Sequence, residues 1–218
     1  MRSKLFLVGA LLMLAGTANA QNLFANPDFE DGNTGFTSQY TFGGSGDLIS
    51  AGYYNVNTNP FPYNGNWTAI GDHTTGSTNM MIVNGSNVPN ISVWAQTVSG
   101  LTPNTDYYFS GWLASVYPSN PASLQFAVNG GSIGGTFNAS STVGQWVQWT
   151  AAWNSGSNTS AIFSIVNQNT QFAGNDFALD DLSLTPTNPG GNNITAPEPG
   201  SLALLGVPMF VFLRKRRK

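Results

Sequence analysis

Short apolar and aromatic runs alternate with clusters of Gly, Asn, Ser and Thr along most of this 218-residue chain. The alternation is typical of many short β-strands joined by turns. Outside the two termini, no long window places apolar residues at helical spacing. The pattern predicts strands over residues 35–42, 67–70, 79–83, 91–98, 105–114, 123–128, 145–153, 159–166 and 176–184. At this length, such a pattern favours a two-sheet β-sandwich.

Two of these segments can be divided into faces, because successive side chains of a strand point to opposite sides of its sheet. One side of the segment 105–114 is expected to face the core, and it carries Tyr107, Phe109, Gly111 and Leu113. The other side is expected to form a wall open to a ligand, and it carries Tyr108, Ser110, Trp112 and Ala114. In the segment 147–153, Val147, Trp149, Ala151 and Trp153 share one face. Large aromatic residues in strands more often belong to the core than to a binding platform.

The first twenty residues have the features of a secretory signal peptide with a short helix. Arg2 and Lys4 precede an apolar stretch over 5–15, and the small residues 18–20 form a cleavage pattern that ends at Ala20. Signal peptidase is therefore an expected partner. The apolar stretch is too short to cross a bilayer, which needs about 20 residues. The alternative interpretation is a buried N-terminal helix.

Charge is distributed unevenly along the chain. All 7 basic residues lie in the terminal segments, whereas residues 21–195 carry only carboxylates. These are Asp28, Glu30, Asp31, Asp47, Asp72, Asp106, Asp176, Asp180 and Asp181. Nucleic-acid binding is excluded, because it needs Lys or Arg to displace the counterions of phosphate. An acidic body without Cys suits an exported protein in a calcium-containing medium.

The composition changes again near the C-terminus. Residues 21–185 are expected to form the sandwich domain, and the Pro/Gly/Asn-rich segment 186–195 a flexible linker. The final segment, 196–218, contains Pro197, Glu198 and Pro199, then thirteen mainly apolar residues, then five basic residues. A helix of thirteen residues is about 20 Å long, against a hydrocarbon core of about 30 Å. We expect a marginal transmembrane helix that inserts transiently into the inner membrane, with the basic cluster on the cytoplasmic side.

This last segment resembles the PEP-CTERM sorting signal of bacterial exported proteins. Pro197, Glu198 and Pro199 match the motif that gives the signal its name, residues 201–213 its apolar segment and 214–218 its basic end. The resemblance implies processing by an exosortase in a Gram-negative cell that makes exopolysaccharide. It also implies a final location at the cell surface or in the extracellular matrix. The alternative is a stable single-span anchor.

The body resembles galactose-binding-like jelly rolls, in particular a group of carbohydrate-binding modules. The similarity rests on "NLFANPDFEDGNTGF" at the start, "ISVWAQTVSGLTPNTDYYFSGWLAS" in the middle and "FALDDLSL" at the end. It implies that Glu30 and Asp180 share a structural Ca²⁺. Acids crowd both ends of the domain without a basic residue to neutralise them, and a hard cation with oxygen ligands would relieve their repulsion. The alternative is that these acids are solvated or cap turns.

The residues argue against an enzyme. The body has no Cys and no Lys, and its only His, His73, is expected to be a hydrogen-bonding turn residue, since one His cannot form a histidine zinc cluster. Carbohydrate binding has a better physical basis, because aromatic faces stack on sugar rings while amides and hydroxyls bind the sugar hydroxyls. Tyr108 and Trp112 are the expected sugar-binding residues. The predicted function is thus a non-enzymatic, exported protein that binds extracellular polysaccharide. The alternatives are a structural matrix protein without a specific ligand and a glycoside hydrolase.

Overall fold

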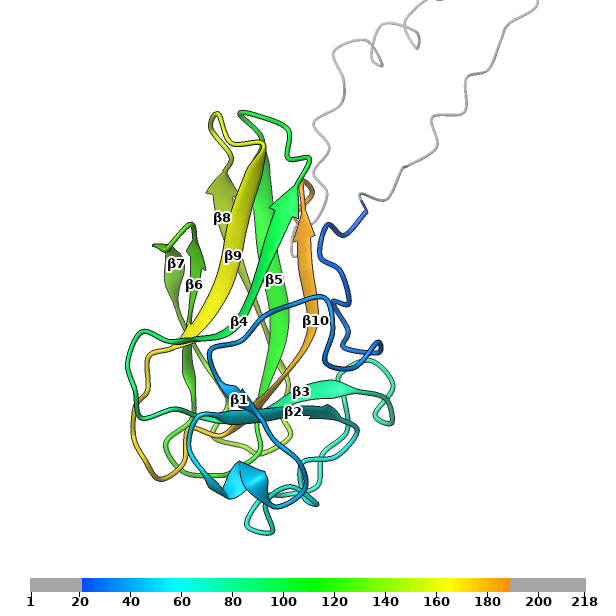
Figure 1. The fold of residues 1–218 in the computed structure, drawn as a ribbon, viewed down its shortest axis with the longest axis vertical. Helices are drawn as coiled ribbons and strands as arrows, with labels where there is room; N and C mark the ends of the chain where they lie inside the picture. Colours follow the sequence, from blue (N-terminus) through cyan, green and yellow to red (C-terminus); the bar gives the residue numbers. More distant parts are fainter. Residues whose placement is uncertain (1–20, 189–218) are drawn as a thin grey trace, which may run out of the picture.

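Ten strands and one 3₁₀ helix make up residues 21–188, the part of the chain that the computed structural model describes (Figure 1). In chain order the elements are β1 (Thr41–Phe42), η1 (Asp47–Ile49), β2 (Tyr53–Asn57), β3 (Met80–Asn84), β4 (Ser92–Ser99), β5 (Asp106–Ser115), β6 (Ser123–Val128), β7 (Gly131–Asn138), β8 (Val147–Asn154), β9 (Ser160–Asn167) and β10 (Phe177–Thr185). Within residues 21–188 there is no helix long and apolar enough to cross a bilayer. The expected signal helix, the cleavage site at Ala20, the Pro197-Glu198-Pro199 motif and the apolar segment 201–213 lie outside the described residues.

The strands form two sheets, ordered β1-β2-β3-β10-β5-β8 and β4-β9-β6-β7. β1 runs parallel to β2, and the other strand pairings are antiparallel. From β3 onward, every connection except the β6–β7 hairpin crosses from one sheet to the other. This is the connectivity of a jelly roll. The prediction of a two-sheet β-sandwich is confirmed.

Most predicted strands are found within one or two residues of their expected bounds, with two exceptions. The predicted strand 67–70 is wrong, because this segment is a loop whose Trp67 turns inward and donates its indole N–H to Asp176 at 3.0 Å. The predicted strand 35–42 is reduced to β1 and an isolated bridge between Thr37 and Ala95. Two observed strands, β2 and β7, were not predicted from the sequence. β2 is rich in Asn, and β7 is a glycine-rich strand at the edge of its sheet. Both residue types are rare in strands.

The main core lies between the two sheets and is dominated by aromatic side chains. Phe109 of β5 stacks on Phe126 of β6, with ring centroids 3.8 Å apart. Trp149 of β8 packs edge-on against Phe126 at 3.7 Å. The expected core face of β5 is buried, and so is Trp149, which is a core residue as its strand face indicated. Aromatic pairs of this kind add about 0.5–1.5 kcal/mol beyond the area that they bury.

The outward face of the six-stranded sheet is divided into two halves. Over β2, β3 and the start of β10, loops cover a second, smaller core, which consists of Leu48, Trp67, Met80, Ile82, Val116 and Ala178. Over β5 and β8 the outward face is only partly covered, and Tyr108 and Trp112 are half-buried there. The wall expected from the sequence is therefore accessible only in part, because Ser110 and Ala114 of the same face are buried.

The N-terminal segment of the domain runs beside β10. The Leu23 amide donates to the Leu184 carbonyl at 3.0 Å, and the Leu182 amide donates to the Pro27 carbonyl at 2.8 Å. The side chain of Asn22 accepts from the Leu184 amide at 2.9 Å. These bonds connect residues about 160 positions apart and bring Asp28 and Glu30 to the side of β10 that carries Asp180.

Substitution of Gly111, on the core face of β5, is expected to destabilise the fold. A Cβ atom there would lie 2.6 Å from Leu182 Cδ2 and 3.0 Å from the Trp149 ring, and both side chains are buried. Overpacking of this kind costs about 1–3 kcal/mol, so Gly111→Ala should lower the free energy of unfolding in urea by that amount. Gly135→Ala, on exposed β7 with no atom within 4 Å, is the control and should change it little. Equal effects of the two variants would contradict the assigned strand face.

Candidate functional site

A bulge in β10 creates the polar site on the outward face of the six-stranded sheet. The β10–β5 register shifts between Asp180 and Ser183, and Asp181 has a left-handed φ of 46°. Bulges redirect side chains and are frequent next to functional sites. Here the bulge turns two consecutive carboxylates in different directions. Asp180 is buried beneath the loop 72–79, while Asp181 is half-exposed and contacts His73.

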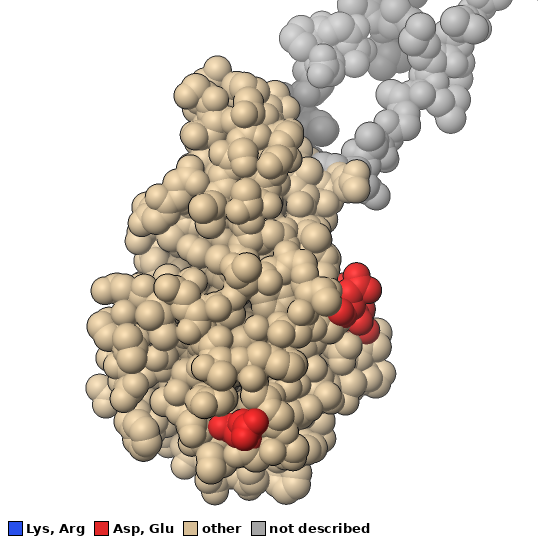
Figure 2. Space-filling view, in the orientation of Figure 1, with Lys and Arg blue, Asp and Glu red and all other residues tan. Residues whose placement is uncertain are grey.

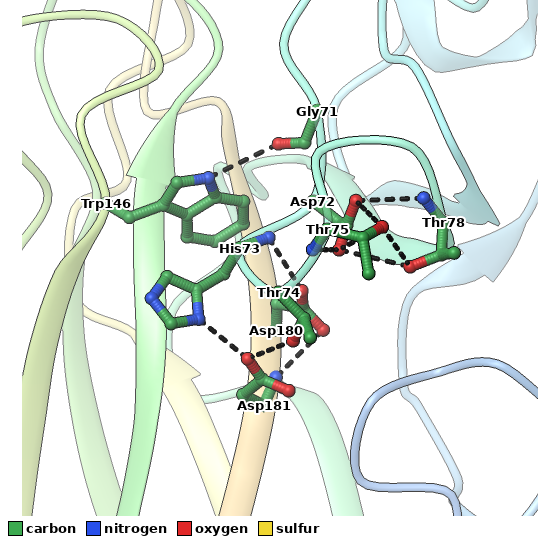
Figure 3. Close-up of polar contacts among 9 residues, drawn as sticks. All are labelled: Gly71, Asp72, His73, Thr74, Thr75, Thr78, Trp146, Asp180 and Asp181. Atoms are coloured by element: carbon green, nitrogen blue, oxygen red, sulfur yellow. Dashed lines mark hydrogen bonds and ion pairs between the residues drawn. The ribbon is translucent and has the colours of Figure 1, made fainter.

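His73 is held by both carboxylates. Its ring Nδ1 lies 2.6 Å from Asp181 Oδ2, and its backbone amide donates to Asp180 Oδ2 at 2.8 Å (Figure 3). The hydroxyl of Thr74 also donates to Asp181 Oδ2, at 2.6 Å. Since Thr74 donates to the carboxylate and not to the imidazole, this arrangement is not that of a hydroxyl nucleophile activated by histidine.

The His73 ring is also part of an aromatic cluster. It stacks on Trp112 of β5, with centroids 3.7 Å apart and planes 16° from parallel. It meets Trp146 edge-on at 5.9 Å, and the Trp146 indole donates to the Gly71 carbonyl at 3.3 Å. One face of the Trp112 indole is therefore covered by His73. Tyr108, four residues away on the same face of β5, has no such cover from His73 and is half-buried.

Between Tyr108 and Trp112 the surface is polar. Ser110 of β5 is itself buried, but it pairs with Thr150 of β8, and Trp112 pairs with Gln148. Gln148 is exposed and Thr150 is half-buried. Directly paired residues share a face of the sheet, so amide and hydroxyl groups lie beside the two aromatic side chains.

Asp72 builds the turn that carries His73. Burial by itself raises the pKa of Asp72, but hydrogen bonds from the amides and hydroxyls of Thr75 and Thr78 outweigh it and lower the pKa to about 2. The amide of Thr75 donates to Asp72 at 2.8 Å and that of Thr78 at 2.9 Å. The sequence predicted His73 as the turn-forming residue, but the hydrogen bonds that hold this turn are accepted by Asp72. The motif Asp-x-x-Thr at residues 72–75 is typical of a side-chain-capped turn, and it could have identified the role of Asp72 from the sequence.

Asp180 is the most buried carboxylate, with 1% of the residue exposed. Burial is the main cause that raises its pKa to about 7, and the charges of Asp181 and Asp72 raise it further. The amide donors of His73 and Asp181 oppose this shift without cancelling it. An ionised Asp180 is thus destabilising in the absence of a cation.

The structure brings the two expected calcium ligands together. Asp28, Glu30 and Asp180 line one pocket with Thr74, Thr75 and Thr78. Glu30 Oε1 accepts from the Asn79 amide at 3.0 Å. Among residues 21–188, no three His, Cys, Asp or Glu side chains are arranged to hold a metal ion. A cation here would therefore need threonine hydroxyl or main-chain oxygens in addition to the carboxylates, and main-chain carbonyl oxygens are common Ca²⁺ ligands. Asp176, which the sequence grouped with these acids, lines a different pocket.

Comparison with known proteins identifies the fold. No protein-family model and no curated protein matches the chain. Among solved structures, the CBM22-1 xylan-binding domain of Paenibacillus barcinonensis Xyn10C superposes with a TM-score of 0.50 and 17% identity, over 78% of this chain and 97% of that domain. The tandem CBM22-1–CBM22-2 structure of the same protein superposes with a TM-score of 0.50 and 18% identity. This match covers 82% of this chain and 50% of the tandem structure.

A further neighbour, the Stig cyclase Fisc from Fischerella sp. TAU, has a TM-score of 0.51 and 12% identity over 77% of this chain and 98% of its own. One fold is thus shared with sugar-binding modules and with a cyclase. At these identities the likeness defines the architecture alone. Residues 21–188 have the jelly-roll fold found in carbohydrate-binding modules.

Proposed function

We propose that this chain is a non-enzymatic carbohydrate-binding protein that acts at the cell surface or in an exopolysaccharide matrix. The observation that carries the proposal is the outward face of β5 and β8, where half-buried Tyr108 and Trp112 lie beside half-buried Thr150 and exposed Gln148. Aromatic rings stack on the C–H face of a pyranose, and amides and hydroxyls bind its hydroxyl groups. The jelly-roll fold of the xylan-binding neighbour supports the same function.

The charge of the body favours a neutral glycan. Figure 2 shows a face with two separate acidic patches and no basic residue, and residues 21–188 contain no Lys or Arg. Asp181, beside Trp112, adds negative charge next to the proposed binding face. A uronate, sulfate or phosphate would meet repulsion and no cationic partner.

Tyr108→Ala should weaken binding to a neutral polysaccharide. Loss of one stacked aromatic corresponds to about 1 kcal/mol, or roughly a fivefold to tenfold rise in Kd. Affinity electrophoresis against xylan, galactan and glucan, with the purified protein, measures it. Phe61→Ala is the control, because Phe61 is 52% exposed and lies elsewhere. Trp112→Ala should act in the same direction, but it also removes the His73 stack.

Three results would contradict this assignment. Equal retardation of wild type and Tyr108→Ala on every polysaccharide would exclude the β5 face as the binding surface. The lack of any retardation of the wild type would favour the alternative of a matrix protein without a specific ligand. Turnover of glycosides by the wild type would favour the hydrolase instead.

We further propose that Glu30 and Asp180 hold a structural Ca²⁺, assisted by Asp28 and by oxygens of the 74–78 loop. The all-oxygen donor set and the buried Asp180 carboxylate support this. When bound, the ion would supply positive charge and fix the N-terminal segment to β10. It would thereby also support the loop that positions His73.

Asp180 should make the stability of the metal-free protein depend on pH. Its pKa is about 7 when folded and near its ordinary value when unfolded, so the folded state binds this proton more tightly. Stability due to this group is therefore present below about pH 4 and is lost as the pH rises towards 7. The measurement is the melting temperature in EDTA, compared with that of Asp180→Asn, which should be the more stable protein at neutral pH.

Calcium should reverse this effect, because it binds the ionised carboxylate. At a hundred times Kd it would add about 2.7 kcal/mol, or roughly 5–10 °C in melting temperature. Asp180→Asn should lose this increase. Asp31→Asn, an exposed acid that does not line the pocket, should keep it. A calcium response that is equal in wild type and Asp180→Asn would refute the assignment.

The sorting motifs support a third proposal, that the chain is exported and then processed by an exosortase near Pro197, Glu198 and Pro199. The mass of the product released by the native host should correspond to a chain that begins after Ala20 and ends near this motif. Replacement of the three motif residues by Ala should leave the basic C-terminus attached. Recovery of the intact chain, Met1 to Lys218, from the cytosol would contradict export.

A further inference from the structure

A second pocket lies at the end of the sandwich where β5 ends and β10 begins, away from Tyr108 and Trp112. Three loops form it, at residues 49–51, 64–67 and 172–176, together with Asn84 and Tyr117. The smaller outer core supports its wall through Trp67. Neither the carbohydrate-binding face nor the proposed calcium pocket shares a lining residue with it.

Asp176 provides a fixed carboxylate in this pocket. It is 7% exposed, and its two oxygens accept from the Trp67 indole at 3.0 Å and from the Gly85 amide at 3.4 Å. Burial is the main cause that raises its pKa to about 6, so the carboxylate is largely ionised at neutral pH. No function proposed above uses this group.

Two buried amides are oriented by a single carbonyl. Asn64 and Asn84 both donate Nδ2 hydrogens to the Leu48 carbonyl, at 3.1 and 2.7 Å. Asn64 Oδ1 accepts from the Asn66 amide at 3.1 Å, and Asn64 and Asn84 both line the pocket. Asn66 itself is exposed at the pocket wall. The pocket thus has two oriented side-chain amides, those of Asn64 and Asn84, beside the carboxylate.

Large apolar side chains stand at the same pocket. Phe172 is 74% exposed and Ile49 is 68% exposed, the two highest values among the exposed large hydrophobic residues of the described chain. Both line this pocket with half-buried Tyr117. Exposed apolar groups beside oriented polar groups are typical of a ligand site rather than of packing.

From these contacts we infer that the end pocket is a second binding site, for a neutral sugar ring whose hydroxyls donate to Asp176 and Asn84 and whose C–H face packs on Phe172. Anionic sugars are disfavoured because the pocket has a carboxylate and the described residues contain no Lys or Arg. The inference extends the proposed function by adding a site to it. It rests on that function only for the class of ligand.

The Trp67 indole N–H, which donates to Asp176, reports directly on this pocket. We would titrate the ¹⁵N-labelled protein with methyl glycosides of glucose, galactose, mannose and xylose, and with glucuronate. The Trp67 indole signal, assigned with Trp67→Phe, should shift with at least one neutral sugar and not with glucuronate. Phe172→Ala should raise the Kd from this shift at least fivefold. Phe61→Ala, an equally large change at another exposed Phe, should leave it unchanged.

The outcomes separate this inference from the proposed function. A Trp67 shift that is lost in Phe172→Ala but kept in Tyr108→Ala supports the second site, whatever happens at the β5 face. Sugar binding that shifts the Trp112 indole alone, and is lost in Tyr108→Ala, overturns the second site and leaves the proposed function standing. A spectrum unchanged by every neutral sugar, or a Trp67 shift equally weakened in Phe61→Ala, also overturns it.

Discussion

Every buried acid of this domain must be stabilised without a Lys or an Arg. Residues 21–188 contain none, yet Asp72, Asp176 and Asp180 are all buried. Burying a charge costs free energy unless the charge is paired or hydrogen-bonded. The three acids differ in how far hydrogen bonds offset this cost. Asp72 accepts enough hydrogen bonds to lower its pKa, whereas Asp176 and Asp180 have fewer donors and raised pKa values. Of the two incompletely stabilised carboxylates, Asp180 lines the proposed calcium pocket and Asp176 lines the end pocket.

The path of β10 places these groups. Asp176 immediately precedes the strand, and Asp180 and Asp181 form its bulge. The N-terminal segment runs beside the same strand, so Glu30 and Asp180 come together although 150 residues separate them in the chain. His73 contacts both carboxylates of the bulge and stacks on Trp112 of the neighbouring strand β5. One central strand thus organises the proposed calcium pocket, the edge of the proposed carbohydrate-binding face and the end pocket.

The same lack of basic residues shapes the ligands that the surface can accept. A jelly roll by itself allows many functions, as the cyclase and the xylan-binding domain among its neighbours illustrate. What is particular to this chain is the combination of half-exposed aromatic rings, side-chain amides and hydroxyls, and carboxylates. This chemistry suits neutral, hydroxyl-rich molecules and opposes anionic ones. The two proposed binding surfaces on one small domain would allow it to contact two glycan segments at once.

Local pattern alone determined the fold class, most strand positions and the core face of β5, because alternation and turn residues are properties of neighbouring residues. It also named Glu30 and Asp180, through a resemblance. The sequence did not reveal the strand β7, whose glycines pair only because β6 lies beside them. Nor did it reveal that His73 covers one face of Trp112, or that Trp67 leaves its expected strand to bind Asp176. His73 and Trp112 are about 40 positions apart, and Trp67 and Asp176 are 109 positions apart. Only the packing of the two sheets and their loops decides that these residues meet.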